Sequence, residues 1–173
     1  GVDRVIRVER PDTVLILGDT TSCMAAIAAR KNGVAVYHME AGNRCFDFNV
    51  PEELNRRLVD HISDFNLCYT EHARRHLLAE GMEHRRVIVT GSPMKEVLAK
   101  FRPQIDASDV LKRLVLSARK YLVASFHRQE NVDSPAHLRA IVDALETLAQ
   151  SHDCPVIVST HPRTHKQHSA LGV

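Results

Sequence analysis

The sequence predicts an α/β fold in which parallel β-strands alternate with helices. Short apolar runs rich in β-branched residues recur along the 173 residues, and amphipathic stretches separate most of them. Glycine or proline stands at many of the places where one element gives way to the next. This alternation is typical of a parallel sheet covered by helices.

The first expected elements are a strand at residues 13–17 and a helix at residues 21–31. The helix is rich in alanine, which permits close packing on a sheet, and Gly33 ends it. Residues 34–38 form the second expected strand, and residues 41–50 form an irregular loop after it.

Pro51 suits the first turn of the next expected helix, because proline lacks the N–H that a first turn leaves unpaired. Leu54, Leu58 and Ile62 recur on this helix at spacings of four and line one face. A third strand is expected at residues 65–68.

Thr70 is placed to cap the helix that follows the third strand. The residues of this helix that are expected to face inward are Ala73, Leu77 and Leu78. Gly81 ends the helix, and a fourth strand at residues 87–90 is closed by Gly91-Ser92-Pro93.

The alternation weakens at residues 92–118 and then resumes. Phe101-Arg102-Pro103 is predicted to break the chain, and a helix at residues 108–118 follows without a strand before it. Strands are expected again at residues 121–125 and 156–159. Between them, a helix begins at Ser134 and Pro135, with a buried stripe of Leu138, Ile141, Val142, Leu145 and Leu148.

These elements predict parts of two Rossmann-like domains. Residues 1–95 form the C-terminal part of the first domain, residues 96–118 a linker, and residues 119–173 the N-terminal part of the second. Two strands are too few to bury both faces of a parallel sheet, and the chain does not begin with Met. We therefore expect truncation at both ends, or completion by a partner chain.

Composition excludes several classes of function. The 23 basic and 21 acidic residues are interspersed, which argues against nucleic acid as the main partner. No apolar run approaches the roughly 20 residues that span a bilayer, and no signal peptide is visible, so we expect no membrane partner. The four cysteines are widely spaced, which favours reduced thiols in the cytoplasm. His161 and His165 have the closest approach to metal-ligand spacing, but Pro162 interrupts them, and no metal is predicted.

Polar residues follow four of the expected strands, at residues 18–22, 38–44, 126–131 and 161–163. Ligands of doubly wound sheets bind beyond the carboxyl ends of the strands. Each group also has an ordinary explanation, since Asp19 can cap a helix and Glu52 can form a surface ion pair with Arg56. Polar residues after four different strands nevertheless indicate a site for an anionic, hydroxyl-rich ligand between two domains.

Five motifs lie along the chain in a fixed order. They are Gly18-Asp19-Thr20-Thr21, His38-x-Glu40-Ala41-Gly42-x-Arg44, Pro51-Glu52-Glu53-x-Asn55-Arg56, Thr90-Gly91-Ser92-Pro93 and His127-Arg128-x-Glu130-Asn131. In order and approximate spacing this set resembles the non-hydrolysing UDP-N-acetylglucosamine 2-epimerases, over nearly the whole chain. The resemblance implies a GT-B-type architecture of two Rossmann-like domains.

Asn43 and the run Cys45-Phe46-Asp47-Phe48-Asn49 look more like the capsule and O-antigen branch of this family, which makes UDP-N-acetyl-L-fucosamine. The family's basic N-terminal loop and its C-terminal Gly-rich segment have no counterpart in this sequence. Much of the nucleotide site expected in the family is therefore missing from the chain.

The resemblance implies epimerisation at C2 of a UDP-N-acetylhexosamine, by elimination and re-addition of UDP, in the synthesis of capsule polysaccharide or lipopolysaccharide precursors. It implies catalytic roles for Asp19, Glu40, Glu52 and His127. Asp19 and Glu52 are expected to transfer protons. The substrate-binding residues that it implies are Thr20, His38, Arg44, Asn55, Arg56, Arg128, Glu130 and Asn131. We expect a homodimer, a UDP-sugar substrate and no cofactor.

Two alternatives stay open. A hydrolysing epimerase or a glycosyltransferase can share this architecture, because fold alone does not fix the reaction. The chain can also be a catalytically inactive fragment that retains its fold or its binding of sugar nucleotides.

Overall fold

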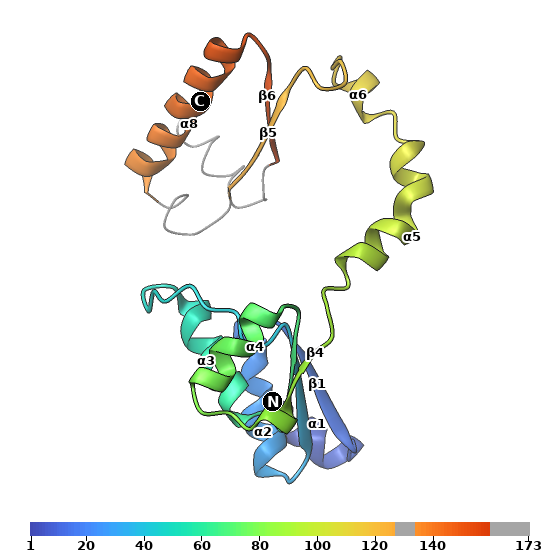
Figure 1. The fold of residues 1–173 in the computed structure, drawn as a ribbon, viewed down its shortest axis with the longest axis vertical. Coiled ribbons are helices and arrows are strands. Elements are labelled where there is room, and N and C mark those ends of the chain that lie inside the picture. The colour runs from blue at the N-terminus through green and yellow to red at the C-terminus, as the bar shows by residue number, and fades with distance from the viewer. Residues whose placement is uncertain (127–133, 160–173) are drawn as a thin grey trace. The chain divides into compact units, whose positions relative to one another are not determined.

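The computed structural model describes residues 1–126 and 134–159. The chain forms two compact units, Gly1–Phe101 and Arg102–Val173. Parallel sheets and helices alternate in both units, so the predicted α/β class is confirmed (Figure 1). The boundary between the units falls inside the segment predicted as a linker, and the assignment of residues 1–95 and 119–173 to separate domains stays a prediction.

Unit 1 contains a four-stranded parallel sheet in the order β1-β2-β3-β4. Its strands are β1 (Thr13–Leu17), β2 (Ala35–Met39), β3 (Phe65–Cys68) and β4 (Val87–Val89), all at predicted positions to within about a residue. In the register of β1 and β2, Leu17 lies opposite Met39. The two strands therefore end level, and the residues that follow them emerge side by side.

The helices of unit 1 are α1 (Val2–Glu9), η1 (Thr21–Met24), α2 (Ala25–Lys31), α3 (Pro51–Ile62), α4 (Glu71–Ala79) and η2 (His84–Arg86). The sequence did not predict α1, and the helix predicted at residues 21–31 begins with the 3-10 turn η1. Successive strands are parallel neighbours, and because such crossovers are nearly always right-handed, α2, α3 and α4 lie on one face of the sheet. On β1, Ile16 is buried, whereas Leu15 and Leu17 point away from it and are exposed.

Two apolar clusters hold unit 1 together. One joins Ile6 of α1 and Ala26 of α2 to Val36 and Val59, and the other packs Leu77 of α4 against β3 and β4. The predicted cap of α4 is confirmed, because the Thr70 hydroxyl accepts a hydrogen bond from the Ala73 N–H at 3.1 Å. The inward positions predicted for α4 are also confirmed.

The apolar face predicted for α3 is not its buried face. Leu54 and Leu58 are exposed, and the helix buries Glu53, Val59 and Asp60 instead. Carboxylates are tolerated in this position because each is paired with cations inside the protein. The spacing of apolar residues alone predicts that the leucines are buried, because it carries no information on the cations that pair with Glu53 and Asp60.

Two predictions about the stretch after β4 are wrong. Pro103 lies inside α5 (Met94–Asp106) rather than breaking the chain. This helix buries none of its residues, so solvent can satisfy the carbonyl group that loses its partner to proline. The helix predicted at residues 108–118 is only α6 (Val110–Arg113), and Val115 and Arg119 adopt positive φ angles after it.

Unit 2 contains a two-stranded parallel sheet of β5 (Leu122–Ser125) and β6 (Val156–Ser159), as predicted. Between them runs α8 (Pro135–His152), which begins with Ser134 accepting a hydrogen bond from the His137 N–H at 3.4 Å. Of the predicted stripe on α8, Leu138 is buried and Leu148 is exposed. None of the helices in the described parts of the chain combines the length and the apolar character needed to cross a bilayer.

Candidate functional site

The carboxyl ends of β1 and β2 bring Asp19 and Glu40 to the same edge of the sheet. The Gly18 N–H donates a hydrogen bond to the Met39 carbonyl at 3.2 Å, which joins the two turns. A Cβ atom placed on Gly18 would lie 3.6 Å from a carboxylate oxygen of Glu40, so that carboxylate lies close over the Gly18 turn. Glu40 itself has a φ of 68°, a left-handed conformation that is costly for a residue with a side chain.

Helix α3 brings Asn55 and Arg56 against Asp19. The Asn55 amide donates to the Asp19 backbone carbonyl at 2.9 Å, and an Arg56 guanidinium nitrogen lies 2.7 Å from the Asp19 carboxylate. Glu52 is exposed and precedes Asn55 and Arg56 by three and four residues, so the three share one face of the helix. Two strand ends and one helix face thus form a charged rim, which we define as Asp19, Glu40, Glu52, Asn55 and Arg56.

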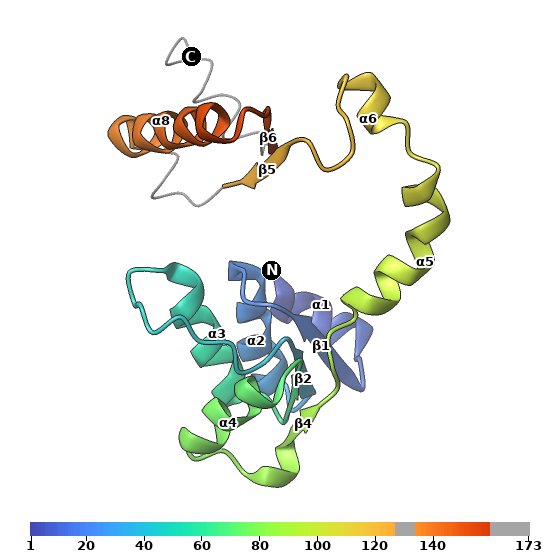
Figure 2. The same cartoon turned by 45° about the horizontal axis from the view of Figure 1, so that its top comes forward.

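Thr20 lies next to Asp19 and is exposed. Its hydroxyl is hydrogen-bonded to the Ser22 hydroxyl at 2.8 Å, and it makes no side-chain cap of η1. The simple explanation that this turn only caps a helix is therefore not supported by the hydrogen bonds. The loop that carries Glu40 leaves the end of β2 and arches outward before it enters α3 (Figure 2).

His38 and Arg44 are buried beneath the rim in unit 1, and their predicted contact with substrate stays a prediction. Both side chains are 0% exposed. The two ring nitrogens of His38 are hydrogen-bonded to Asp60 and to the Gly18 carbonyl. Arg44 is paired with Asp60 and Glu80. Within the described residues, every polar partner of the two side chains comes from inside unit 1.

Asp60, the acid that contacts both His38 and Arg44, was not singled out from the sequence. One of its carboxylate oxygens lies 2.7 Å from His38 Nδ1, and the other lies 2.7 Å from Arg44 Nη1. A signal for it exists in the sequence, because Asp60 follows Glu53 by seven residues. Two turns of helix separate them, which places both acids on the same face of α3.

Glu53 is a second buried acid of α3, and it binds the backbone of the loop between β2 and α3. Its carboxylate accepts hydrogen bonds from the Cys45 N–H at 2.9 Å and from Arg57 Nε at 2.8 Å. Burial alone would raise the pKa of Glu53, but the hydrogen bonds from Cys45 and Arg57 outweigh it and lower the pKa from 4.5 to about 2. Glu53 is therefore charged in the folded protein at neutral pH.

Glu53→Gln is expected to lower the free energy of unfolding at neutral pH by roughly 3 kcal/mol, the equivalent of the pKa change. Because the folded-state pKa is depressed, the stabilisation is full above pH 4.5 and is lost as the pH falls through about 2. Urea denaturation of both forms at several pH values between 7 and 2 measures this difference. Glu71→Gln is the matched control, since Glu71 is half exposed and pairs only with neighbours on α4. A gap between wild type and Glu53→Gln that stays constant over this range would contradict the prediction.

Four of the predicted site residues lie outside the described residues. They are His127, predicted to be catalytic, and Arg128, Glu130 and Asn131, predicted to bind substrate. Within residues 1–126 and 134–159, no group of three or more His, Cys, Asp or Glu side chains is arranged to hold a metal ion.

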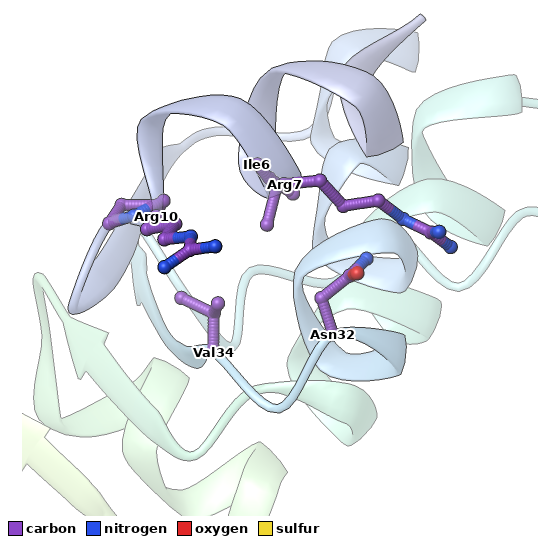
Figure 3. Close-up of a pocket in the computed structure, with 6 residues that line it drawn as sticks. Ile6, Arg7, Arg10, Asn32 and Val34 are labelled. Atoms are coloured by element: carbon purple, nitrogen blue, oxygen red, sulfur yellow. The ribbon is translucent and has the colours of Figure 1, made fainter.

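The described part of the chain also has hollows away from the rim. One of about 410 Å³ lies between α1 and the end of α2, and Arg7, Arg10 and Asn32 contribute to its lining (Figure 3). Another of about 240 Å³ is lined by Asn66 and Arg86 among others. Arg10 precedes β1, and Arg86 precedes β4, so both hollows lie at the amino-terminal edge of the sheet, opposite the rim.

A parallel sheet with helices between its successive strands is Rossmann-like, and proteins of this class bind ligands beyond the carboxyl ends of the strands. The family described as UDP-N-acetylglucosamine 2-epimerase matches residues 1–171. The chain belongs to this family.

Known structures and relatives agree with this assignment. The structure of UDP-N-acetylglucosamine 2-epimerase from Rickettsia bellii is 47% identical with a TM-score of 0.88, over 97% of this chain and 44% of that one. A Methanocaldococcus jannaschii UDP-GlcNAc 2-epimerase in complex with UDP-GlcNAc and UDP is 34% identical with a TM-score of 0.88, over 99% of this chain and 48% of that one.

A third relative carries a different substrate in its name. The UDP-2,3-diacetamido-2,3-dideoxy-D-glucuronate 2-epimerase of Pseudomonas aeruginosa is 37% identical over 175 residues, which are 99% of this chain and 48% of that protein. The chain spans about half the length of the curated relatives it matches.

Proposed function

We propose that the protein containing this chain epimerises C2 of a UDP-N-acetylhexosamine. The observation that carries the proposal is the charged rim, in which Asp19 is held by Asn55 and Arg56 beside Glu40. Family membership supports it, and the bound UDP-GlcNAc and UDP of the Methanocaldococcus jannaschii protein support a UDP-sugar as the ligand class.

In the proposed reaction, a carboxylate removes the proton from C2 while the bond between C1 and the UDP oxygen breaks. The products are a 2-acetamidoglycal and UDP, and the electron pair of the C2–H bond forms the new double bond. Re-addition of UDP at C1, with a proton delivered to the opposite face of C2, gives the epimer. Nothing is oxidised or reduced overall, so the scheme needs no redox cofactor.

Asp19 and Glu52 are the proposed proton-transfer groups, because carboxylates on two sides of a shared rim can act as acid and base. Arg56 orients Asp19 through their ion pair. Glu40 contributes to sugar binding or to a proton relay. The proposal gives His127 the role of stabilising the departing phosphate or acting as an acid, and it assigns substrate contacts to Thr20, Arg128, Glu130 and Asn131.

The sequence of the loop after β2 is the basis for proposing a particular UDP-hexosamine. Asn43 and the residues Cys45-Phe46-Asp47-Phe48-Asn49 favour the branch that makes UDP-N-acetyl-L-fucosamine for capsule or O-antigen. The name of the relative from Pseudomonas aeruginosa specifies a substrate other than UDP-N-acetylglucosamine. It therefore supports the idea that members of this family differ in the UDP-sugar that they use. A cytoplasmic homodimer with two Rossmann-like domains in each protomer is part of the same proposal.

Asp19→Asn is expected to slow the exchange of the C2 proton for deuterium by at least about 100-fold, because general acid–base groups contribute about 10² to 10⁴ in rate. Incubation of the UDP-hexosamine with the protein in deuterated water, followed by NMR of the C2 position, measures this exchange. Asp12→Asn is the control, since Asp12 is exposed at the other end of β1. Equal exchange rates in wild type and Asp19→Asn would refute the assignment of Asp19.

The same assay separates the alternatives. A hydrolysing epimerase releases free sugar, a glycosyltransferase requires an acceptor, and the proposed enzyme keeps the UDP-sugar intact. Comparison of the 173-residue chain with a protein of its relatives' full length tests whether the chain alone is an inactive fragment.

A further inference from the structure

Asp60 lies at the centre of a buried network that links both turns of the rim. Its Oδ2 atom accepts hydrogen bonds from Arg44 Nη1 at 2.7 Å and from the Gly42 N–H at 3.2 Å. Its Oδ1 atom lies 2.7 Å from His38 Nδ1. Asp60 on α3 therefore contacts both β2 and the loop that carries Glu40.

The hydrogen bonds of His38 define its charge. Nε2 lies 3.0 Å from the Gly18 carbonyl oxygen, which can only accept, so Nε2 carries a hydrogen. Nδ1 faces the Oδ1 atom of Asp60. The Oδ2 atom of Asp60 accepts hydrogen bonds from the Gly42 N–H and from the Arg44 guanidinium, and these contacts favour an ionised carboxylate. An acceptor therefore faces each ring nitrogen, an arrangement that suits a ring with a hydrogen on both.

The charges around His38 are paired with one another. Arg44 lies between Asp60 and Glu80, and Glu80 also pairs with Arg57 and His61. Burial raises the pKa of the nearby Cys68 thiol to about 11, with a further contribution from Asp60, so this thiol is neutral. A buried charge is tolerated only when it is paired in this way.

We propose that Asp60 is a positioning residue for the rim, and that it acts by holding His38 as a buried imidazolium. The imidazolium donates to the Gly18 carbonyl and fixes the turn that leads into Asp19. Asp60 itself fixes the loop after Glu40 through Gly42 and Arg44. Because Asp60 and His38 are 0% exposed, they act through these turns and not by touching substrate.

The protonation of His38 is tested directly by NMR of the whole chain labelled with ¹⁵N-histidine, with His38→Gln used to assign the signals. We expect both ring nitrogens of His38 to carry a hydrogen, because each faces an acceptor. In Asp60→Asn, where the carboxylate is lost, His38 is expected to become a neutral tautomer. A wild-type His38 with a hydrogen on only one ring nitrogen would overturn the proposal.

The kinetic arm rests on the proposed epimerase function and uses a protein of the relatives' full length. Asp60→Asn is expected to lower kcat about tenfold or more, while KM changes less, because misplacement of reacting groups lowers the rate of the chemical step. Asp60→Glu is expected to recover part of the rate, since it restores the negative charge. An unchanged kcat in a folded Asp60→Asn protein would contradict a positioning role.

Asp64→Asn is the matched control. Asp64 also pairs with an arginine, Arg30, and accepts a hydrogen bond from a β2 backbone N–H, that of Val36, but at the amino-terminal end of the strand. The Asp64→Asn variant is expected to be less stable, with an unchanged kcat and unchanged His38 signals. If it loses as much kcat as Asp60→Asn, the role of Asp60 is structural only and the positioning role is contradicted. A wild-type protein without epimerase activity refutes the proposed function, and the NMR result on His38 then decides the positioning network by itself.

Discussion

Arg44→Ala is expected to lower the free energy of unfolding by about 3–5 kcal/mol, the usual cost of removing one partner from a buried ion pair. The Arg44 guanidinium donates to both carboxylate oxygens of Glu80, at 2.8 and 2.6 Å, and to Asp60 at 2.7 Å. Burial alone would lower the pKa of Arg44, but the hydrogen bonds to Glu80 and Asp60 outweigh it and raise the pKa. The guanidinium is therefore charged at every pH at which the protein folds.

The large cost follows from what the substitution leaves behind. Alanine removes the cation and leaves the buried Asp60 carboxylate with His38 and the Gly42 N–H as its remaining partners. It also opens a cavity next to the Asn43 carbonyl, which accepts from the same guanidinium at 2.7 Å. Urea denaturation of the chain, followed by circular dichroism, measures the loss.

Arg75→Ala is the control for this substitution. Arg75 is a mostly exposed arginine of α4 whose nearest acid, Glu71, is 3.7 Å away. Exposed pairs contribute about 0–1 kcal/mol, so this variant should be close to wild type. If both variants lose the same small amount, Arg44 is not the buried partner described above.

Gly42→Ala is expected to lower the free energy of unfolding by about 2–5 kcal/mol, for two reasons that add. Gly42 has a φ of 82°, where a side chain costs roughly 1–2 kcal/mol. A Cβ atom at this position would also lie 2.3 Å from the Ala73 carbonyl oxygen, and backbone atoms of α4 cannot move away cheaply. Overpacking of this kind adds about 1–3 kcal/mol.

Gly33→Ala separates the two reasons. Gly33 has a similar φ of 74°, but no atom lies within 4 Å of a Cβ placed on it. It should show only the conformational cost of roughly 1–2 kcal/mol, and the remainder of the Gly42→Ala effect then measures the contact with α4. Equal losses for the two variants, measured by urea denaturation, would show that α4 does not press against the loop.

Much of the rim was predictable from the sequence because strand ends follow a general rule. Parallel strands of a doubly wound sheet end at one edge, so Asp19 and Glu40 could be assigned to that edge from strand positions alone. Pro51 marked the start of α3, and spacings of three and four placed Glu52, Asn55 and Arg56 on one helix face. These are local properties of the chain.

The place of His38 was missed for a reason that also lies in the sequence. In a strand, residues two apart share a face, and His38 shares its face with the buried Val36. The alternation could have predicted that His38 lies under the helices. It could not have supplied the acid that makes this burial possible.

The sequence by itself determined the order of strands and helices along the chain, the cap at Thr70 and the polar character of the strand ends. Only the tertiary structure decided that α3 turns Glu53 and Asp60 inward and leaves Leu54 exposed. The physical reason is that a buried carboxylate depends on partners distant in the sequence. Asp60 meets His38 and Arg44 across 22 and 16 positions, and such pairings exist only once the sheet and its helices have come together.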